Sequence, residues 1–449
     1  MKIGLIGNMN NNNFALMRYF RDLGADAHLL LYANDGKGGL SHFKPECDTW
    51  VIDKWKMYIH QTDIQNTPIS ALGFPFSTVW SLKSLLMFWL GKNHYWQRAI
   101  SKREIIETYH SYDKLVASGI SPANLLRVRR SLDIFYPYSS GVEFLGTGEF
   151  IVRFKGAFGI NGLILKHVSR RQSIGIQFAK SVVNAELSLT HDLLKGIGIE
   201  PIVLPIPMLY DGEILPEEPP SKTLQEAWLA IKDVQFTLLH LARIMWVNPG
   251  NYSNEAWKKE NKNNDILLHS IAEFVRLRPN INPLLLIVEY GPDVESTKRL
   301  AAELDVERYI HWLPQMDRRE LLWLLSRVSV GVGEFYDVPR MIWGGTGWET
   351  LASGKPLLQG FNFEEGEFDK LYGYPPPPML AVRNREDILQ HLLDMADFPH
   401  KRNEIGRGAK EWFSRYNGIG LAKRWLDLTI APRDTDMQKV AEGNQGHGC

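Results

Sequence analysis

The feature that most constrains the fold is a repeated alternation of short apolar runs with longer amphipathic segments. The chain begins with an apolar run at 2–7 (KIGLIG), continues through a polar loop and a helical segment that ends at Gly24, and returns to an apolar run at 27–32 (AHLLLY). Short apolar runs separated by helical segments are typical of parallel strands joined by crossover helices. The start of the chain is therefore predicted to form a βαβ unit.

The same alternation restarts in the second half of the chain. Apolar runs predict strands at 236–242, 283–291, 309–314, 328–334 and 356–360, and amphipathic segments predict helices at 265–279, 296–305, 318–327 and 347–354. Between the halves, residues 211–221 (DGEILPEEPPS) are acidic and rich in proline, which is typical of an interdomain linker. We predict two doubly wound α/β domains, at 1–208 and 222–410. Such domains bind ligands beyond the carboxyl ends of their strands, so we expect the site in a cleft between them.

Composition excludes several classes of protein. The 51 Lys and Arg residues balance the 51 Asp and Glu residues, which argues against a broad phosphate-neutralising surface for nucleic acid. Cys47 and Cys449 lie far apart in the sequence and support neither a disulfide framework nor a cysteine zinc site. No Asp-x-Asp motif or cluster of His, Asp and Glu is persuasive as a divalent metal site. No uncharged run reaches the ~20 residues that span a bilayer, and we predict a cytoplasmic protein.

The most informative motif is WGGTGWETLASGKPLLQG, residues 343–360, in which a glycine-rich turn precedes a helix and a strand. The glycines permit close backbone approach, and the free N–H groups of the first helical turn form a ready site for a diphosphate. A glutamate one turn into the helix can accept hydrogen bonds from sugar hydroxyls. The alternative is a tight turn whose glutamate only stabilises the helix dipole. The candidate residues in this motif for binding a diphosphate and its attached sugars are Gly344, Gly345, Thr346, Gly347 and Glu349.

Three segments in order resemble the C-terminal donor domain of one enzyme family. WETLASGKPLL (348–358) is similar to a helix-and-strand segment in which a glutamate precedes Gly-x-Pro. LARI (241–244) places a basic residue after the first strand of the domain, and KNNDILLHSIAEF (262–274) resembles a Lys-Gly-x-Asp-x-Leu-Leu segment. The family is glycosyltransferase family 4, the large group of retaining GT-B enzymes that includes sucrose and glycan-assembly enzymes. The resemblance covers residues 235–430.

The resemblance implies a GT-B fold, in which two Rossmann-like domains face a cleft and the C-terminal helix crosses back to the first domain. Residues 411–430 carry more aromatic surface than a solvent-facing terminal helix should expose, and we expect them to complete the first domain, with Trp412 and Trp425 as anchors. The polar residues 431–449 are predicted to form a disordered tail.

The resemblance also implies a function. A hexosyltransferase-like enzyme would transfer a sugar from a UDP- or GDP-linked donor to a hydroxyl of a glycan, lipid-linked or small-molecule acceptor, with retention of configuration and with neither metal nor cofactor. Arg243 and Lys262 would bind the diphosphate as the catalytic cations, and Glu349 would bind the ribose. Fixed cations and a helix N-terminus stabilise the charge on the departing β-phosphate more in the transition state than in the ground state. The alternative is that both cations are ordinary surface charges.

The chain departs from the family pattern at two places. The family has two glutamates eight positions apart, whereas Met341 stands eight positions before Glu349. Glu334 or Asp337 can reach the sugar from the preceding loop, or backbone groups of Gly344 to Thr346 can bind it, and we keep Glu334 as a donor-binding candidate. The usual glycine after the lysine is here Asn263.

The N-terminal half offers weaker candidates for the acceptor side. The loop GNMNNNNF (7–14) follows the first predicted strand, and its Asn side chains can bond phosphate or acceptor hydroxyls, or can only cap the next helix. This loop lacks Gly-x-Gly-x-x-Gly, which disfavours a dinucleotide-binding oxidoreductase. The acceptor-side candidates are Asn10, Asn12, Ser118, Ser139 and Glu143.

Residues 70–103 combine aromatic and aliphatic side chains with Lys and Arg. An apolar face edged with cations can lie on an anionic membrane and collect a lipid-linked acceptor, which would make the protein peripheral on the inner face. The alternative is a buried pair of helices in the first domain.

Two other functional classes fit the same architecture. A nucleotide-sugar epimerase would convert the sugar without an acceptor. A noncatalytic sugar- or partner-binding protein would bind the donor without turnover, and the missing first glutamate leaves that hypothesis open.

Overall fold

The computed structural model describes residues 1–33, 35, 44–66, 100–137, 160–184, 189–250 and 253–432. The chain divides into two compact units. Unit 1 comprises Met1–Pro45, Val51–Pro207 and the described residues from Leu421 onward, and unit 2 comprises Glu46–Trp50 and Met208–Gly420.

The described residues of unit 1 form a seven-stranded parallel sheet in the order β3-β2-β1-β4-β5-β6-β7. The strands are β1 (Lys2–Ile6), β2 (Asp26–Leu31), β3 (Ile59–Gln61), β4 (Lys114–Ala117), β5 (Ile134–Phe135), β6 (Ser181–Asn184) and β7 (Ile202–Val203). The helices are α1 (Asn12–Asp22), α2 (Ile52–Trp55), α4 (Lys102–Tyr109), α5 (Ser121–Leu126), α8 (Ile160–Gln177), α9 (Leu189–Gly196) and α19 (Ile419–Ile430). The predicted βαβ unit at the start of the chain is present as β1, α1 and β2.

The described residues of unit 2 form a six-stranded parallel sheet in the order β10-β9-β8-β11-β12-β13. The strands are β8 (Phe236–His240), β9 (Pro283–Val288), β10 (Ile310–Leu313), β11 (Val330–Val332), β12 (Leu357–Gly360) and β13 (Leu380–Val382). The helices are α10 (Lys222–Ile231), α11 (Asn254–Glu260), α12 (Asp265–Leu277), α13 (Val294–Glu303), α14 (Arg318–Leu325), α15 (Gly345–Ala352), α16 (Glu367–Tyr372), α17 (Arg385–Asp397) and α18 (Pro399–Tyr416). All five strands predicted in this half are present.

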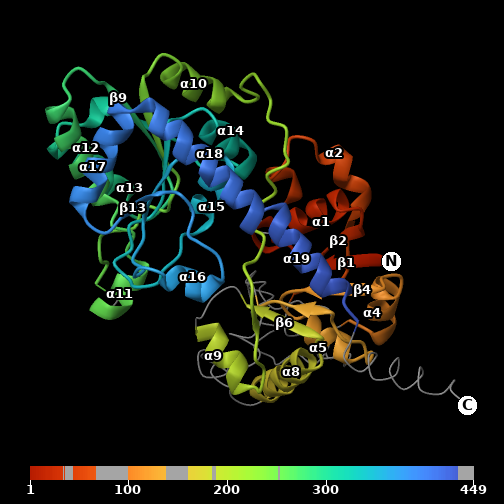
Figure 1. Ribbon diagram of the computed structural model, residues 1–449. Helices are drawn as coiled ribbons and strands as arrows, with labels where there is room; N and C mark the ends of the chain where they lie inside the picture. Colours follow the sequence, from red (N-terminus) through yellow and green to blue (C-terminus); the bar gives the residue numbers. More distant parts are fainter. Residues whose placement is uncertain are drawn as a thin grey trace, which may run out of the picture. The chain divides into compact units, whose positions relative to one another are not determined.

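Helices cover both faces of the sheet in unit 2, because its strands are apolar on both sides. Leu238 of β8 belongs to the core that includes α12, α13 and α17, whereas the next residue, Leu239, belongs to the core that includes α10, α14, α15 and α18. Figure 1 shows the second of these layers, in which α18 runs along the unit and packs against α15. Successive residues of a strand point to opposite faces, so a continuous apolar run requires a helix layer on each face.

The segment predicted as a linker is instead packed into unit 2. Trp323 Nε1 on α14 donates to Pro216 O at 2.8 Å, and Arg327 Nη2 donates to the carbonyls of Pro216 and Glu217. The proline-rich segment 211–221 therefore lies against α14, and the chain passes between units at Pro207 and Met208. Proline has no backbone N–H, so a proline-rich segment has few backbone donors for its carbonyls. Here the side chains of Trp323 and Arg327 donate to these carbonyls instead.

The two predicted aromatic anchors belong to different units. Trp425 of α19 donates from Nε1 to Pro205 O at 2.8 Å in unit 1. Trp412 of α18 stacks on Trp348 with ring centroids 6.2 Å apart, in unit 2. The first unit is therefore completed from Leu421 rather than from residue 411, because α18 is still part of the aromatic core of unit 2.

Residues 70–99 of the predicted membrane-contact segment 70–103, and residues 433–449 of the predicted tail, lie outside the described residues. Of the helices in the described ranges, none combines the length and hydropathy that a bilayer-spanning segment needs.

Candidate functional site

The strand order of unit 2 marks one position for a ligand. β8 pairs with β9 on one side and with β11 on the other, where His240 lies opposite Val332. The chain order therefore reverses between β8 and β11, and open α/β sheets bind ligands beyond the carboxyl ends of their strands at such a switch point. The loops that leave these two strands carry the predicted site residues Arg243 and Glu334.

Backbone hydrogen bonds join three loops at this switch point. The Lys262 N–H donates to Met245 O at 2.8 Å, and the Phe335 N–H donates to Lys262 O at 3.1 Å. Asn263 has a φ of 46°, a left-handed conformation that Asn tolerates better than most residues. This conformation explains why Asn can replace the usual glycine, and Asn263 Nδ2 donates to Phe335 O at 2.7 Å.

A buried histidine and asparagine support the same loops. Met245 N–H donates to Asn264 Oδ1 at 2.9 Å, which leaves Asn264 Nδ2 facing His240 Nε2 at 2.9 Å. Because Nδ2 is a donor, His240 Nε2 accepts, and the ring proton of the neutral imidazole is on Nδ1. Burial lowers the pKa of His240 to about 4, so this neutral form is the one present at pH 7.

Lys262 and Glu334 form a nearly buried ion pair at the switch point. Lys262 Nζ lies 2.8 Å from Glu334 Oε1, and each side chain is only 10% exposed. The ammonium also lies 4.1 Å from the centroid of the Tyr336 ring. Glu334 Oε2 is buried and has no hydrogen-bond partner within the described part of the chain. A buried acceptor without a donor costs about 1–3 kcal/mol, so this oxygen is suited to a ligand that donates a hydrogen bond.

The first turn of α15 lies beside this ion pair. Gly344 is the N-cap of α15, and a β-carbon placed on Gly344 would lie 3.4 Å from Glu334 Oε2. Gly347 packs against Trp343, where a β-carbon would collide with the indole. The N–H groups of Gly345 and Thr346 have no acceptor inside the helix, as is general for a first turn. Glycines thus allow the helix N-terminus to approach the carboxylate closely.

A glutamine on the neighbouring strand holds the backbone of Glu334. Gln359 Oε1 accepts from the Glu334 N–H at 3.0 Å, and Gln359 Nε2 donates to Glu334 O at 2.6 Å. The Gln359 side chain is fully buried. Gly333 leaves room for it, since a β-carbon there would collide with Gln359 Oε1. Gln359 is therefore a positioning residue for Glu334.

Arg243 is held more loosely than Lys262. Its Nη2 lies 3.5 Å from Glu260 Oε2, and its side chain is 39% exposed. An exposed pair of this kind contributes about 0–1 kcal/mol, so the guanidinium can exchange Glu260 for a more highly charged partner. The structure brings together Lys262, Glu334 and the start of α15, and it leaves Arg243 on the adjoining loop beside Glu260.

Glu349 lies in a buried chain of charges. Arg318 Nε donates to Glu349 Oε1 at 2.8 Å, and Arg318 Nη1 donates to Asp48 Oδ1 at 3.0 Å. Burial raises the pKa of Glu349 above its ordinary value, although Arg318 opposes the shift. Arg318 therefore already engages one carboxylate oxygen of Glu349, the residue predicted to bind the ribose.

The switch point of unit 1 gathers three of the five acceptor-side candidates. Ile6 of β1 lies opposite Ala117 of β4, so the Asn-rich loop and Ser118 leave adjacent strands. Asn10 has a left-handed φ of 52°, and Asn12 is buried with neither amide atom hydrogen-bonded in the described part of unit 1. The other two candidates, Ser139 and Glu143, lie outside the described residues.

Sequence reasoning missed Gln359, Asn264 and Arg318. Gln359 lies within an apolar strand, and a polar residue there was the available signal. Asn264 follows Asn263 in a polar stretch and Arg318 begins an amphipathic helix, so nothing in the pattern separates either from a surface residue. No three His, Cys, Asp or Glu side chains of the described residues gather as metal ligands would.

Comparison with known proteins identifies the fold. No protein-family model and no curated protein matches the sequence. HepE from Anabaena, in complex with UDP and glucose, is 13% identical, with 96% of this chain and 99% of that chain covered and a TM-score of 0.54. A TarM variant from S. aureus, in complex with fondaparinux, α-GlcNAc-glycerol and UDP, is 9% identical, with 96% and 100% covered and a TM-score of 0.52. Sucrose-phosphate synthase from Thermosynechococcus elongatus is 12% identical, with 95% and 98% covered and a TM-score of 0.51. The predicted α/β fold of the GT-B type is confirmed.

Replacing Gln359 by Leu should destabilise the protein. The substitution leaves the Glu334 N–H without a partner and leaves the Glu334 carbonyl with the Gly360 N–H alone, and an unpaired buried group costs about 1–3 kcal/mol. Urea unfolding followed by tryptophan fluorescence measures the loss. The control, Gln315→Leu at an exposed position, should stay within about 0.5 kcal/mol of the parent protein. Equal unfolding midpoints for both variants would contradict the positioning role.

Stability should fall between pH 6.5 and pH 4 because of His240. Its pKa is about 4 in the folded protein against the ordinary 6.5, so the unfolded chain binds the proton first as pH falls. The contribution is fully present above pH 6.5 and is lost as pH falls through 4, on the order of 3 kcal/mol in all. Unfolding free energies measured across this range should decline less steeply for His240→Gln, which does not titrate. Parallel pH profiles would show that His240 is not buried in the neutral form.

Proposed function

We propose that the chain is a glycosyltransferase that binds a nucleotide-sugar donor in unit 2. The observation that carries the proposal is the Lys262–Glu334 pair at the sheet switch point, next to the first turn of α15. The shared fold supports it, because HepE and TarM have been solved with UDP and sucrose-phosphate synthase is named for a sugar-transfer product. Membership in glycosyltransferase family 4, retention of configuration and metal independence are part of the proposal and rest on the sequence resemblance.

Lys262, Arg243 and the N-terminus of α15 bind the diphosphate of the donor. The N–H groups of Gly345 and Thr346 supply hydrogen bonds, and the helix end contributes roughly half a positive charge. As the glycosidic bond breaks, negative charge grows on the β-phosphate, and preorganised donors stabilise this charge without needing to reorient. Arg243 leaves Glu260 and turns to the phosphates when the donor binds.

Glu334 takes the place of the missing first glutamate and binds the donor sugar. Its Oε1 is paired with Lys262, and its buried Oε2 accepts a hydrogen bond from a sugar hydroxyl. This assigns Met341 no role at the sugar. Glu349 binds the ribose through the carboxylate oxygen that Arg318 does not hold, and Arg318 fixes the rotamer of Glu349.

The acceptor hydroxyl belongs to a glycan or a lipid-linked molecule and is bound by unit 1. Asn12 and Ser118 lie at the switch point of that unit, and the free amide of Asn12 can accept from one hydroxyl and donate to another.

Lys262→Met should reduce sugar transfer by about 10²–10³-fold, the loss typical of one transition-state donor. UDP, GDP and their sugar conjugates are first screened by thermal shift, since a ligand raises the unfolding temperature by binding the folded state. Release of the free nucleotide from the best donor then measures turnover with candidate acceptors. Lys258→Met, an exposed lysine of α11, is the matched control. Failure of every nucleotide to bind, or full turnover by Lys262→Met, would refute the proposal.

Glu334→Gln should separate nucleotide binding from sugar transfer. Lys262 and Arg243 are balanced by Glu334 and Glu260, so removing one carboxylate makes the site more positive and UDP should bind several-fold more tightly. Turnover of the UDP-sugar should nevertheless fall, because the amide is a weaker acceptor for the sugar hydroxyl. Calorimetry with UDP and steady-state kinetics measure the two effects. Weaker UDP binding with unchanged turnover would remove Glu334 from the sugar site.

A further inference from the structure

Unit 2 contains a cavity at the edge of the sheet opposite the candidate donor site. The cavity has a volume of about 310 Å³ and lies at the amino ends of β8 and β11, where Thr237 and Ser329 line it. Gly354, which follows α15, lines the same cavity, whereas Gly344 at the other end of α15 lies beside Glu334. The cavity is therefore distinct from the donor site.

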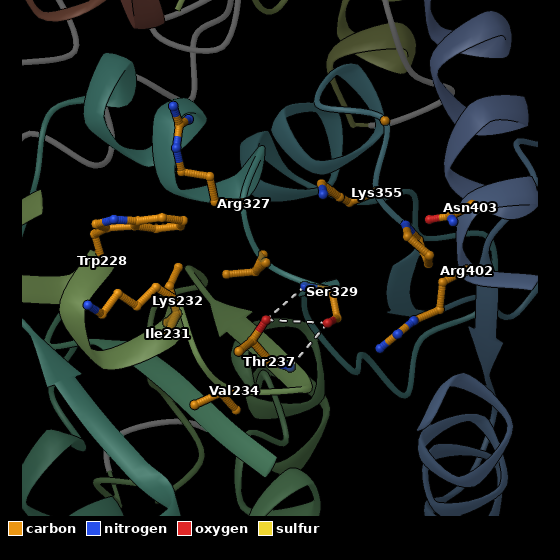
Figure 2. Close-up of a pocket in the computed structure, with 13 residues that line it drawn as sticks. Trp228, Ile231, Lys232, Val234, Thr237, Arg327, Ser329, Lys355, Arg402 and Asn403 are labelled. Carbon is orange, nitrogen blue, oxygen red and sulfur yellow. Dashed lines mark hydrogen bonds between the residues drawn. The ribbon is translucent and has the colours of Figure 1, made fainter. Parts of the chain in front are cut away.

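The lining of this cavity is basic. Lys232, Arg327, Lys355 and Arg402 line it, and its lining includes no Asp or Glu. Two of these cations are already engaged: Lys232 lies 4.0 Å from Asp233, and Arg327 donates to the carbonyls of α14 and of the 216–217 segment. Figure 2 shows the Arg327 guanidinium turned away from the centre of the cavity. Lys355 and Arg402 remain as the cations that can meet a ligand.

Lys355 and Arg402 are partly buried, and no carboxylate of the described residues forms an ion pair with either. Arg402 Nη1 is buried without a hydrogen-bond partner in the described part of the chain. Burial lowers the pKa of Lys355, and the positive charges of Arg402 and Arg327 lower it further. Burial likewise lowers the pKa of Arg402. Unpaired charges in a low-dielectric environment destabilise a folded protein, so this arrangement is explained if an anion joins them.

A hydroxyl completes the set of donors. Ser329 Oγ accepts from Thr237 N–H at 3.2 Å and from Thr237 Oγ1 at 3.3 Å. A hydroxyl has two acceptor sites and one hydrogen, so the Ser329 hydrogen is left to point elsewhere. Figure 2 shows Ser329 between Lys355 and Arg402 on one side and Trp228 and Ile231 of α10 on the other.

We propose that this cavity binds a small phosphorylated molecule, with its phosphate held by Lys355, Arg402 and Ser329. The volume of about 310 Å³ is at the lower end of small-molecule sites and exceeds the needs of a bare phosphate. The rest of the ligand packs against Trp228 and Ile231, which form an apolar wall. This site is separate from the proposed donor site and does not depend on the proposed function.

Inorganic phosphate is the probe for this site. Thermal unfolding is measured in phosphate and in chloride at the same pH and ionic strength, with the whole protein. Phosphate at ten times its dissociation constant should raise the unfolding temperature by roughly 1–3 °C. Lys262→Met should keep this response, which excludes the donor site as its source. A response that disappears in Lys262→Met and persists in Lys355→Gln would overturn the proposal.

Lys355→Gln distinguishes a ligand site from a structural cluster. If the cations await an anion, the variant should unfold at a higher temperature in chloride, because repulsion is relieved, and should lose the response to phosphate. If Lys355 were structural, the variant would unfold at a lower temperature or fail to fold, and that outcome counts against the proposal. Arg402→Gln should lose the phosphate response in the same way. The control is Arg407→Gln, an exposed arginine of α18, which should respond as the parent protein does.

Calorimetry supplies a readout that stability alone does not give. Phosphate binding should restore the pKa of Lys355 toward its ordinary value, so the protein should take up protons from the buffer near the lowered pKa. Titrations in two buffers of different ionisation enthalpy should give different apparent heats, and this difference should be absent in Lys355→Gln. Equal heats in both buffers for the parent protein would contradict a phosphate held by Lys355.

Discussion

The parallel pairing of β8 with β11 is the constraint on which the candidate site depends. Because His240 lies opposite Val332, the loops that leave the two strands begin side by side, and Lys262 is fixed between them by backbone bonds to Met245 and Phe335. A one-residue slip in this pairing would turn every side chain of the strand to the other face of the sheet. Apolar contacts on both faces oppose such a slip. The core therefore fixes the geometry of a polar site to which it contributes no ligand.

The buried cations of unit 2 differ in their pairing at the two ends of its strands. At the carboxyl edge, Lys262 is paired with Glu334 at 2.8 Å, and the cost of burial is offset before any ligand arrives. At the amino edge, Lys355 and Arg402 line one cavity whose lining includes no Asp or Glu, and burial lowers the pKa of both. The first arrangement is preorganised and stable when empty. If the second binds an anion as proposed, the free energy of unfolding should depend on the phosphate concentration around the protein.

The sequence allowed the fold to be predicted from strand order, whereas the prediction for Lys262 rested on the family resemblance. Parallel strands bring their carboxyl ends to one edge of the sheet, so residues on the loops that leave neighbouring strands, such as Arg243 and Glu334, can be predicted to lie near each other. Gln359 and Arg318 could not be predicted in this way, since their partners, Glu334 and Asp48, are distant in sequence. The segment 211–221 misled for a related reason: proline and acidic residues are typical of linkers, but donors on α14 bind its carbonyls.

In the proposed function, Glu334 supplies the carboxylate that the family pattern has eight positions before Glu349. The loop between β11 and α15 is long enough that the carboxylate precedes Glu349 by more than the family spacing, and Met341 occupies the expected position. The structure accommodates the longer loop by burying Trp343, which packs under Gly347 and lies near Trp348, Phe368 and Trp412. Burial of an indole offsets the entropy of ordering a longer loop. Glu334 is then held by the strand itself, through Gln359, rather than by the loop, and for this reason its position does not depend on how many residues follow it.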